Sequence, residues 1–274
     1  MSLMLKLLTI ALLTSSLFGA AKNADIEIFL YKKFKNNEDI KSINIKVISK
    51  SKMDNMPSWN AYIMDINAIL KDNRKVNQKM IWFSNGSVIT QDFINLKTGE
   101  SLKNSVSPKF KAEFYKKANL IYGNEDAKHK VAIFSDPLCP FCRTFVPKAI
   151  KYMKKRPDTF AIYYYHLPLP SLHPAAVELT KAAIAAELRG HKDVTLNLYK
   201  VKVDAKERNV SKILKEFNKV LGTNIKPNDL NNPEVVSHYN NDEKIASYLM
   251  VQGTPTMFFD DKEDKTKKKY KEIK

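Results

Sequence analysis

Cys139 and Cys142 are the two cysteines of the chain, and they stand in the motif Cys139-Pro140-Phe141-Cys142. A disulfide between them would close almost no chain, so it would remove little entropy from the unfolded state and stabilise poorly. A structural zinc site needs more ligands, and no third cysteine or histidine at ligand-like spacing accompanies the pair. We therefore predict thiol exchange and no metal, while a chance pair of inert core cysteines remains an alternative.

The residues around the pair suit this chemistry. The apolar run over residues 131–134 predicts a buried strand, Ser135-Asp136-Pro137 breaks it, and a helix is expected over residues 145–155. A thiol attacks as the thiolate, which the positive end of a helix stabilises. We expect Cys139 at the mouth of the helix to be the attacking thiol, and a less exposed Cys142 in its first turn to be the resolving thiol.

The neighbours of the cysteines have weaker signals. Pro140 suits a first helical turn, and Phe141 is expected to add apolar cover. Asp136 either carries a proton to the buried thiol or caps the following helix, and the sequence favours neither. His166 and His173 flank a proline-rich turn, where a surface or capping role is favoured over tuning of the site. Residues 163–165 are three tyrosines that we assign to sheet packing.

The second half of the chain alternates between strands and helices. We predict a strand over residues 160–166, helices over 174–191, 210–221 and 241–249, and an apolar strand over 257–259 that follows Thr254-Pro255. The charged tail over residues 262–274 is predicted to be a solvated end.

The first half, residues 23–106, is predicted to be mostly β. Strands are expected over residues 26–31, 43–48, 61–64 and 93–96, and a hairpin over 80–90 with a type I′ turn at Asn85-Gly86. This half contains no cysteine, no histidine and no titratable cluster, which favours scaffolding or assembly over chemistry. From Pro108 onward, Phe110, Phe114 and Ala118 are spaced four apart, which predicts a connecting helix.

The N-terminus has the pattern of a secretory signal peptide. Lys6 precedes an apolar run over residues 7–18, and Gly19-Ala20-Ala21 offers a cleavage site after Ala21. The run is shorter than the roughly 20 residues of a spanning helix, which disfavours a membrane anchor. We expect an exported protein. Its formal charge of +17 suggests acidic partners, but charge bears on association and not on fold, and nucleic acid is not expected.

The stretches over residues 123–131 and 134–142 resemble the active-site approach of the thioredoxin-fold Dsb proteins of the bacterial periplasm, in particular the DsbC/DsbG isomerases. Thr254-Pro255 is similar to the cis-proline loop of that family. The resemblance implies that Thr254 and Pro255 bind a substrate peptide beside Cys139. Threonine is typical of DsbC and DsbG at this place, whereas DsbA oxidases usually carry valine.

Residues 93–102 are similar to the end of the DsbC/DsbG dimerisation domain. The resemblance implies an α+β protein with a cystatin-like dimerisation domain over residues 22–106 and a linker helix over 107–121. A thioredoxin-fold catalytic domain would follow over 122–274, with a helical insertion at about 170–250. It also implies a periplasmic homodimer without a cofactor, acting on exported client proteins and recycled by a membrane thiol-redox partner.

Residues 164–170 and 173–176 look more like DsbA-type and DsbG-type sequences, which leaves the direction of electron flow open. The leading hypothesis is disulfide isomerisation or reduction. A DsbA-like oxidase on a dimeric scaffold and a periplasmic chaperone that holds unfolded chains are the alternatives.

Overall fold

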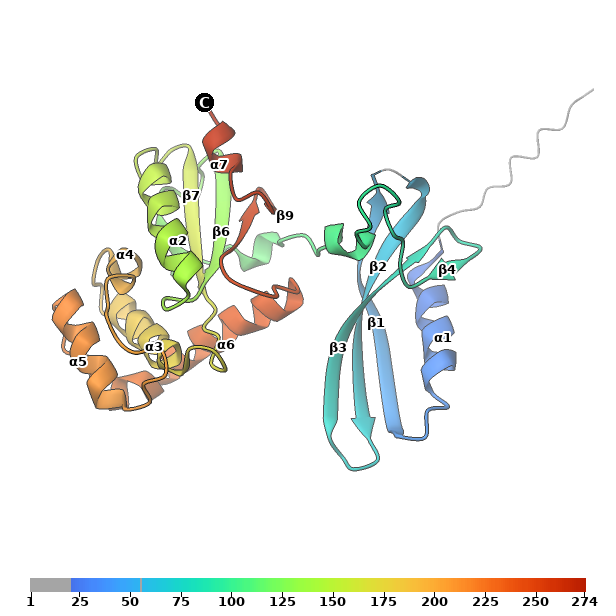
Figure 1. The fold of residues 1–274 in the computed structure, drawn as a ribbon, viewed down its shortest axis with the longest axis horizontal. Coiled ribbons are helices and arrows are strands. Elements are labelled where there is room, and N and C mark those ends of the chain that lie inside the picture. Colours follow the sequence, from blue (N-terminus) through green and yellow to red (C-terminus); the bar gives the residue numbers. More distant parts are fainter. Residues whose placement is uncertain (1–20, 55) are drawn as a thin grey trace, which may run out of the picture. The chain divides into compact units, whose positions relative to one another are not determined.

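The computed structural model describes residues 21–54 and 56–274, so the expected signal peptide, apart from Ala21, lies outside the described residues. The chain divides into two compact units, of which one ends at Val106 and the other begins at Ser107 (Figure 1). Together they make an α+β protein, as expected. No helix among the described residues is both long and apolar enough to span a bilayer.

The N-terminal unit is a four-stranded antiparallel sheet with one helix on it. The strands follow in the order β1 (Ile40–Met53), β2 (Met56–Leu70), β3 (Lys75–Ser84) and β4 (Ile89–Thr90). Helix α1 (Asn23–Phe34) packs Ile26 and Leu30 against apolar residues of the sheet. The core of this unit also contains Ile45, Val47, Tyr62, Met64, Ile66 and Trp82.

The strand predicted over residues 26–31 is wrong, because these residues lie in α1. Ile26 and Leu30 are buried and stand one helical turn apart, whereas Ile28, Phe29 and Tyr31 are exposed. Asp25 in the first turn and two lysines in the last turn complement the helix dipole. The apolar run was read as a strand, but it forms a helix of which only one face is buried.

The end of the sheet also differs from the sequence-based expectation. The hairpin forms, but four residues, Asn85 to Val88, connect β3 with β4, and only Gly86 among them has a positive φ, of 100°. Asn85 Oδ1 accepts hydrogen bonds from the amides of Ser87 and Val88, both at 3.0 Å. The turn is therefore not type I′. The strand expected over residues 93–96 is reduced to a single bridge between Ile94 and Ser101.

The second unit is built on a five-stranded sheet in the order β5-β7-β6-β8-β9. The central strands β6 (His129–Ser135) and β7 (Phe160–His166) are parallel and are connected by helix α2 (Pro140–Met153). The outer strands β5 (Leu120–Tyr122), β8 (Thr256–Phe259) and β9 (Lys262–Glu263) join antiparallel. The active-site candidates thus follow the carboxyl end of β6, at the centre of the sheet.

Both faces of this sheet are covered. On one face, Val146 and Ile150 of α2 pack with Val131 and Ile133 of β6. On the other face, helix α6 (Pro233–Tyr248) packs with alternate residues of the same strands, among them Phe134 and Tyr165. Residues 163–165 are buried in β7, as predicted for sheet packing.

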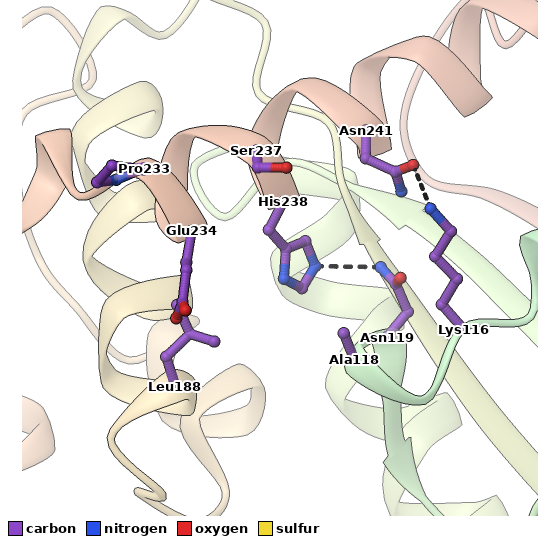
Figure 2. A pocket seen from close by; sticks show the side chains of 9 residues that line it. All are labelled: Lys116, Ala118, Asn119, Leu188, Pro233, Glu234, Ser237, His238 and Asn241. Carbon is purple, nitrogen blue, oxygen red and sulfur yellow. Dashed lines mark hydrogen bonds between the residues drawn. The ribbon is translucent and has the colours of Figure 1, made fainter.

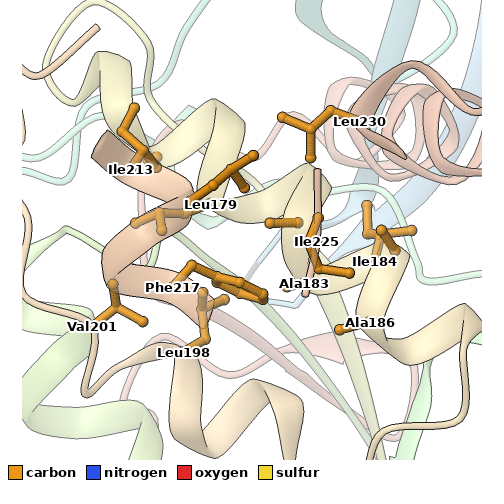
Figure 3. Packing of buried hydrophobic residues seen from close by; sticks show 14 of the residues in the cluster. Leu179, Ala183, Ile184, Ala186, Leu198, Val201, Ile213, Phe217, Ile225 and Leu230 are labelled. Carbon is orange, nitrogen blue, oxygen red and sulfur yellow. The ribbon is translucent and has the colours of Figure 1, made fainter. Parts of the chain in front are cut away.

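The segment between β7 and β8 is helical, as predicted. It contains α3 (Pro174–Leu188), α4 (Val194–Leu198), α5 (Val210–Leu221), the 3-10 turn η4 (Pro227–Asn231) and α6. Figure 3 shows its core, in which Phe217 of α5 lies among residues from the neighbouring helices. Asn209 caps the start of α5 through a bond from Lys212 N at 3.1 Å, and Gly222 ends it at φ 65°. Helix α6 begins earlier than predicted because Asn232 caps it at Pro233.

The linker helix expected over residues 107–121 is wrong. The segment contains the short 3-10 turns η2 (Ala112–Phe114) and η3 (Lys117–Asn119), and η1 (Leu102–Ser105) precedes it. Phe110 is buried against Phe134 and Phe258, and its ring centroid lies 4.5 Å from that of Tyr115, with the two rings tilted. This aromatic packing fixes the segment along the second unit and replaces the helical path.

The charged tail is also more ordered than predicted. Tyr270, in helix α7 (Lys269–Glu272), is 2% exposed and belongs to the same core as α2. Asp264 is buried and accepts hydrogen bonds from Thr266 and from the amide of Lys269. These contacts satisfy a carboxylate that the sequence pattern assigned to solvent.

Candidate active site

The cysteine pair lies where β6 leads into α2. Cys139 is the N-cap of α2, Pro140 is its first residue, and Cys142 lies in its first turn. Both cysteines are free thiols in this structure. Cys139 therefore stands at the N-terminus of the helix, and its side chain makes no capping hydrogen bond there.

The Thr254-Pro255 loop, 115 residues further along the chain, lies beside the Cys139 sulfur. The Thr254–Pro255 peptide bond is cis, and Cys139 Sγ lies 3.5 Å from the carbonyl oxygen of Thr254. Cys139, Cys142, Thr254 and Pro255 thus gather at one site, as the sequence analysis placed them. Phe141 differs from expectation, because it is 76% exposed and so packs little against the protein.

The two thiols have unequal surroundings. Cys142 is fully buried, and this burial raises its pKa to about 12. The side chains of Ser135 and Thr254 act against this rise without cancelling it. The Thr254 hydroxyl is itself buried and has no hydrogen-bond partner among the described residues. Cys142 therefore stays protonated at neutral pH unless its surroundings change.

A family model described as Thioredoxin matches residues 116–274. The chain belongs to this thioredoxin family. Family membership and the Cys139–Cys142 pair identify it as a thiol:disulfide oxidoreductase. In residues 21–54 and 56–274, no cluster of three or more His, Cys, Asp or Glu side chains could hold a metal ion.

Several solved structures are similar to part of this thioredoxin-family chain. BdbD from Bacillus subtilis is 21% identical, with 61% of this chain and 93% of that chain covered and a TM-score of 0.47. The thiol-disulfide exchange protein alpha-DsbA2 from Wolbachia pipientis is 21% identical, with 59% and 90% covered and a TM-score of 0.46. ScsC from Proteus mirabilis is 22% identical, with 55% and 73% covered and a TM-score of 0.45. No curated protein matches the chain.

Asp136 anchors the active-site loop of this thioredoxin-family enzyme. Its buried carboxylate accepts hydrogen bonds from the amides of Leu138 at 2.7 Å, Cys139 at 3.2 Å and Leu169 at 2.8 Å, and lies 2.9 Å from His173 Nδ1. Both carboxylate oxygens are engaged. The sequence analysis left helix capping open beside proton transfer, but the N-cap of α2 is Cys139, and Asp136 instead holds the loop that precedes the helix. His173 thus joins the loop before α3 to the cysteine motif.

His166 is also not the surface residue that the sequence favoured. It is 1% exposed, and its ring packs edge-on against Tyr164. Its Nε2 atom lies 3.8 Å from a carboxylate oxygen of Glu187. Its backbone amide donates to Asp242 on α6 at 2.9 Å. His166 therefore joins β7 to the helices that cover the sheet.

Three hydroxyl groups beside Cys142 are the part of the site that sequence reasoning missed. Ser135 Oγ lies 2.6 Å from Tyr199 OH, and Tyr199 OH lies 2.8 Å from Tyr164 OH. The position of Ser135, four residues before Cys139 at the end of the predicted strand, was a usable signal. Tyr199 had none, because it lies 64 residues away and its contact depends on the packing of α4.

A second polar cluster lies around Asp242. Asn119 Nδ2 donates to Asp242 at 2.8 Å and to the carbonyl of Tyr164 at 3.0 Å, and His238 lies 3.6 Å from Asp242. Figure 2 shows His238 turned toward Asn119 in a pocket, with Lys116 beside it. Burial raises the Asp242 pKa to about 6 and lowers the His238 pKa to about 4.

These two shifts give opposite pH dependences. The folded state holds the Asp242 proton more tightly than the unfolded chain, so this group's contribution to stability is lost as pH rises from about 4 to about 6. The unfolded chain protonates His238 more readily, so its contribution is gained as pH rises from about 4 to 6.5. In the native protein the two contributions largely cancel.

Asp242→Asn removes one side of this balance. We expect the free energy of unfolding of the variant, relative to that of the native protein, to rise by about 2 kcal/mol between pH 4 and pH 6, with a slope of at most about 1.4 kcal/mol per pH unit for one proton. Urea denaturation at a series of pH values measures this. His238→Gln is the matched control and should show the opposite slope. Parallel pH profiles for both variants and the native protein would contradict the assignment.

Proposed function

We propose that this thioredoxin-family enzyme isomerises or reduces disulfides in exported proteins, in the manner of the DsbC/DsbG type. The observation that carries the proposal is the position of Cys139 Sγ, at the N-terminus of α2 and 3.5 Å from the Thr254 carbonyl oxygen. A nucleophilic sulfur there can meet a disulfide in a peptide that binds along the Thr254-Pro255 loop. Cys142, in the first turn of the same helix, is fully buried.

The proposed reaction starts from both thiols reduced. The Cys139 thiolate attacks one sulfur of the client disulfide, a mixed disulfide forms, and the other client sulfur leaves as a thiolate that takes up a proton. The client thiolate can then attack elsewhere in the client, which rearranges its disulfides without net oxidation. Alternatively, the Cys142 thiolate attacks the Cys139 sulfur, and the client leaves reduced by two electrons while the cysteine pair is oxidised.

Thr254, Pro255 and Phe141 are the proposed client-binding residues. The exposed Phe141 ring offers apolar contact directly beside the nucleophile. The Thr254 hydroxyl, buried without a partner among the described residues, is available to the sulfur or to a bound chain. Threonine before the proline is the feature by which the sequence resembles DsbC and DsbG.

A DsbA-like oxidase is the second candidate, supported by the similarity of residues 164–170 and 173–176 to DsbA-type sequences. It would begin from the Cys139–Cys142 disulfide and run the same intermediate in reverse. The two functions require opposite resting states of the cysteine pair.

The resting thiol state in cells separates these functions. Cells are quenched with acid, free thiols are alkylated with a reagent that retards migration, and the protein is resolved by gel shift. For an isomerase or reductase we expect a mostly reduced pool, and a Cys139→Ser, Cys142→Ser double variant marks the position of unmodified protein. A mostly oxidised pool would contradict the isomerase proposal and favour the oxidase.

The compartment and the partners belong to the same proposal. Residues 1–21 would direct export to the periplasm, where a membrane thiol-redox partner would keep the pair in its working state. The N-terminal unit would form a homodimer, supported by the similarity of residues 93–102 to a dimerisation domain. A monomeric mass in solution would contradict the dimer.

A further inference from the structure

Ser135, Tyr199 and Tyr164 form a buried row of hydroxyl groups from three separate elements. Ser135 ends β6, Tyr164 lies in β7, and Tyr199 caps the C-terminus of α4. Ser135 is 0% exposed, Tyr164 2% and Tyr199 6%. The Tyr199 oxygen lies between the other two, 2.6 Å from that of Ser135 and 2.8 Å from that of Tyr164. A buried hydroxyl is costly unless it is paired, so the row is held together by its own hydrogen bonds.

The row lies beside the buried thiol. Cys142, Tyr164 and Tyr199 belong to one buried cluster, and the Ser135 side chain acts on the Cys142 pKa in the direction that favours the thiolate. Burial, and with it negative charge on Cys142, raises the pKa of both tyrosines. Both phenols therefore remain protonated and can only lend neutral O–H groups to the sulfur.

Cys142 needs such donors at one moment of the reaction. Before resolution it is a buried neutral thiol, and after resolution it is part of a disulfide, but its sulfur carries negative charge while it attacks. Hydrogen bonds to a charged group in a buried site are stronger than those between neutral groups. If each hydroxyl in the row donates to the next, the hydrogen bonds strengthen one another, and the hydroxyl nearest the sulfur becomes a stronger donor.

We propose that Ser135, Tyr199 and Tyr164 are positioning residues that stabilise developing negative charge on the Cys142 sulfur during exchange with Cys139. The inference rests on the proposed function and deepens it. In resolution, Cys142 loses its proton to solvent, its sulfur bonds to the Cys139 sulfur, and the Cys139–client bond breaks. The client sulfur leaves with the electron pair and is then protonated. In the reverse step, Cys142 is the leaving thiolate and meets the same donors.

This role has a distinctive signature. Cys142 is uncharged both as a thiol before resolution and in the disulfide after it. Loss of a hydroxyl should therefore slow resolution and its reverse by the same factor and leave the equilibrium constant unchanged. A residue that merely supports the fold would instead alter the equilibrium between the oxidised and reduced pair, or the stability of one of them. The comparison of rates with the equilibrium constant is therefore the decisive readout.

The test uses Ser135→Ala, Tyr199→Phe and Tyr164→Phe in the full chain, with glutathione as the probe. Rapid-quench alkylation follows the release of glutathione from a preformed Cys139–glutathione mixed disulfide, and the reverse reaction of the oxidised pair. We expect both rates to fall about ten-fold for Ser135→Ala, about three-fold for Tyr199→Phe and less for Tyr164→Phe. The equilibrium constant with glutathione should stay within two-fold, about 0.4 kcal/mol.

Tyr165→Phe is the matched control. Tyr165 is the neighbouring tyrosine of β7 and donates to the Phe114 carbonyl at 2.6 Å, outside the row. We expect its rates to equal those of the native protein. Tyr199→Phe keeps the aromatic ring, so it tests the row if Ser135→Ala does not fold.

Three outcomes would overturn the inference. They are unchanged Cys142 rates in Ser135→Ala and Tyr199→Phe, an equal loss in Tyr165→Phe, and a rate loss matched by a shifted equilibrium constant. The first step is measured separately in a Cys142→Ser background, where the row variants should form the mixed disulfide at the native rate. If no mixed disulfide forms at Cys139 in that background, the proposed function itself fails.

Discussion

Replacing Cys139 with serine is expected to reduce disulfide exchange to the uncatalysed background, a loss of at least about a thousand-fold, because a serine hydroxyl does not ionise near neutral pH. Cys142 cannot replace it, since burial raises the Cys142 pKa to about 12 and leaves little thiolate. The measurement is the rate of reduction of a disulfide-bonded peptide by dithiothreitol with and without the variant. A residual rate within ten-fold of the native rate would contradict the assignment of Cys139.

Cys142→Ser is the matched control for this prediction. The variant retains the nucleophile at the N-cap of α2 and should react once with a client disulfide at close to the native rate. It should then accumulate as a mixed disulfide during net reduction, because the internal resolving thiol is missing. Rearrangement of a scrambled client should survive in part, since a client thiol can still resolve the intermediate.

Asp136→Ala is expected to lower the free energy of unfolding by about 3–5 kcal/mol. The substitution removes the acceptor of three backbone amides and the partner of His173 in a buried loop. Those donors would lose their partner away from water, which costs more than the hydrogen bonds themselves. Urea denaturation of the reduced protein measures the change.

Asp136→Asn separates loss of charge from loss of the acceptor. The asparagine carbonyl can still accept from Leu138 and Cys139, but its amide group would face the donor of Leu169. We expect a smaller loss of stability than for alanine. A loss below about 1 kcal/mol for Asp136→Ala would show that the loop is anchored by other contacts.

Much of the second unit could be predicted from the sequence because local pattern and tertiary packing agree there. Helix α5 spans the predicted residues 210–221, with Asn209 and Gly222 as its caps, and β7 spans the predicted residues 160–166. Local and tertiary signals disagree in α1, where an apolar run read as a strand buries only Ile26 and Leu30. They disagree again after Pro108, where aromatic packing prevents the helix.

Only part of the candidate site could likewise be predicted from the sequence. The cysteine motif and Thr254-Pro255 could be placed in advance because each is a short, local pattern. The contacts of Asp136 with Leu169 and His173, and of Ser135 with Tyr199, join segments between 33 and 64 residues apart. Only the packed fold brings these groups together, so no local pattern could indicate them.

The central claim, that Cys139 is the sulfur that joins the client, is tested most directly by mass spectrometry of a trapped intermediate. The Cys142→Ser variant is incubated with a disulfide-bonded peptide, quenched in acid and digested without reduction. We expect one peptide adduct, attached at Cys139, and none with Cys139→Ser under the same conditions. An adduct at Cys142 in the Cys139→Ser variant, or no adduct in Cys142→Ser, would contradict the account.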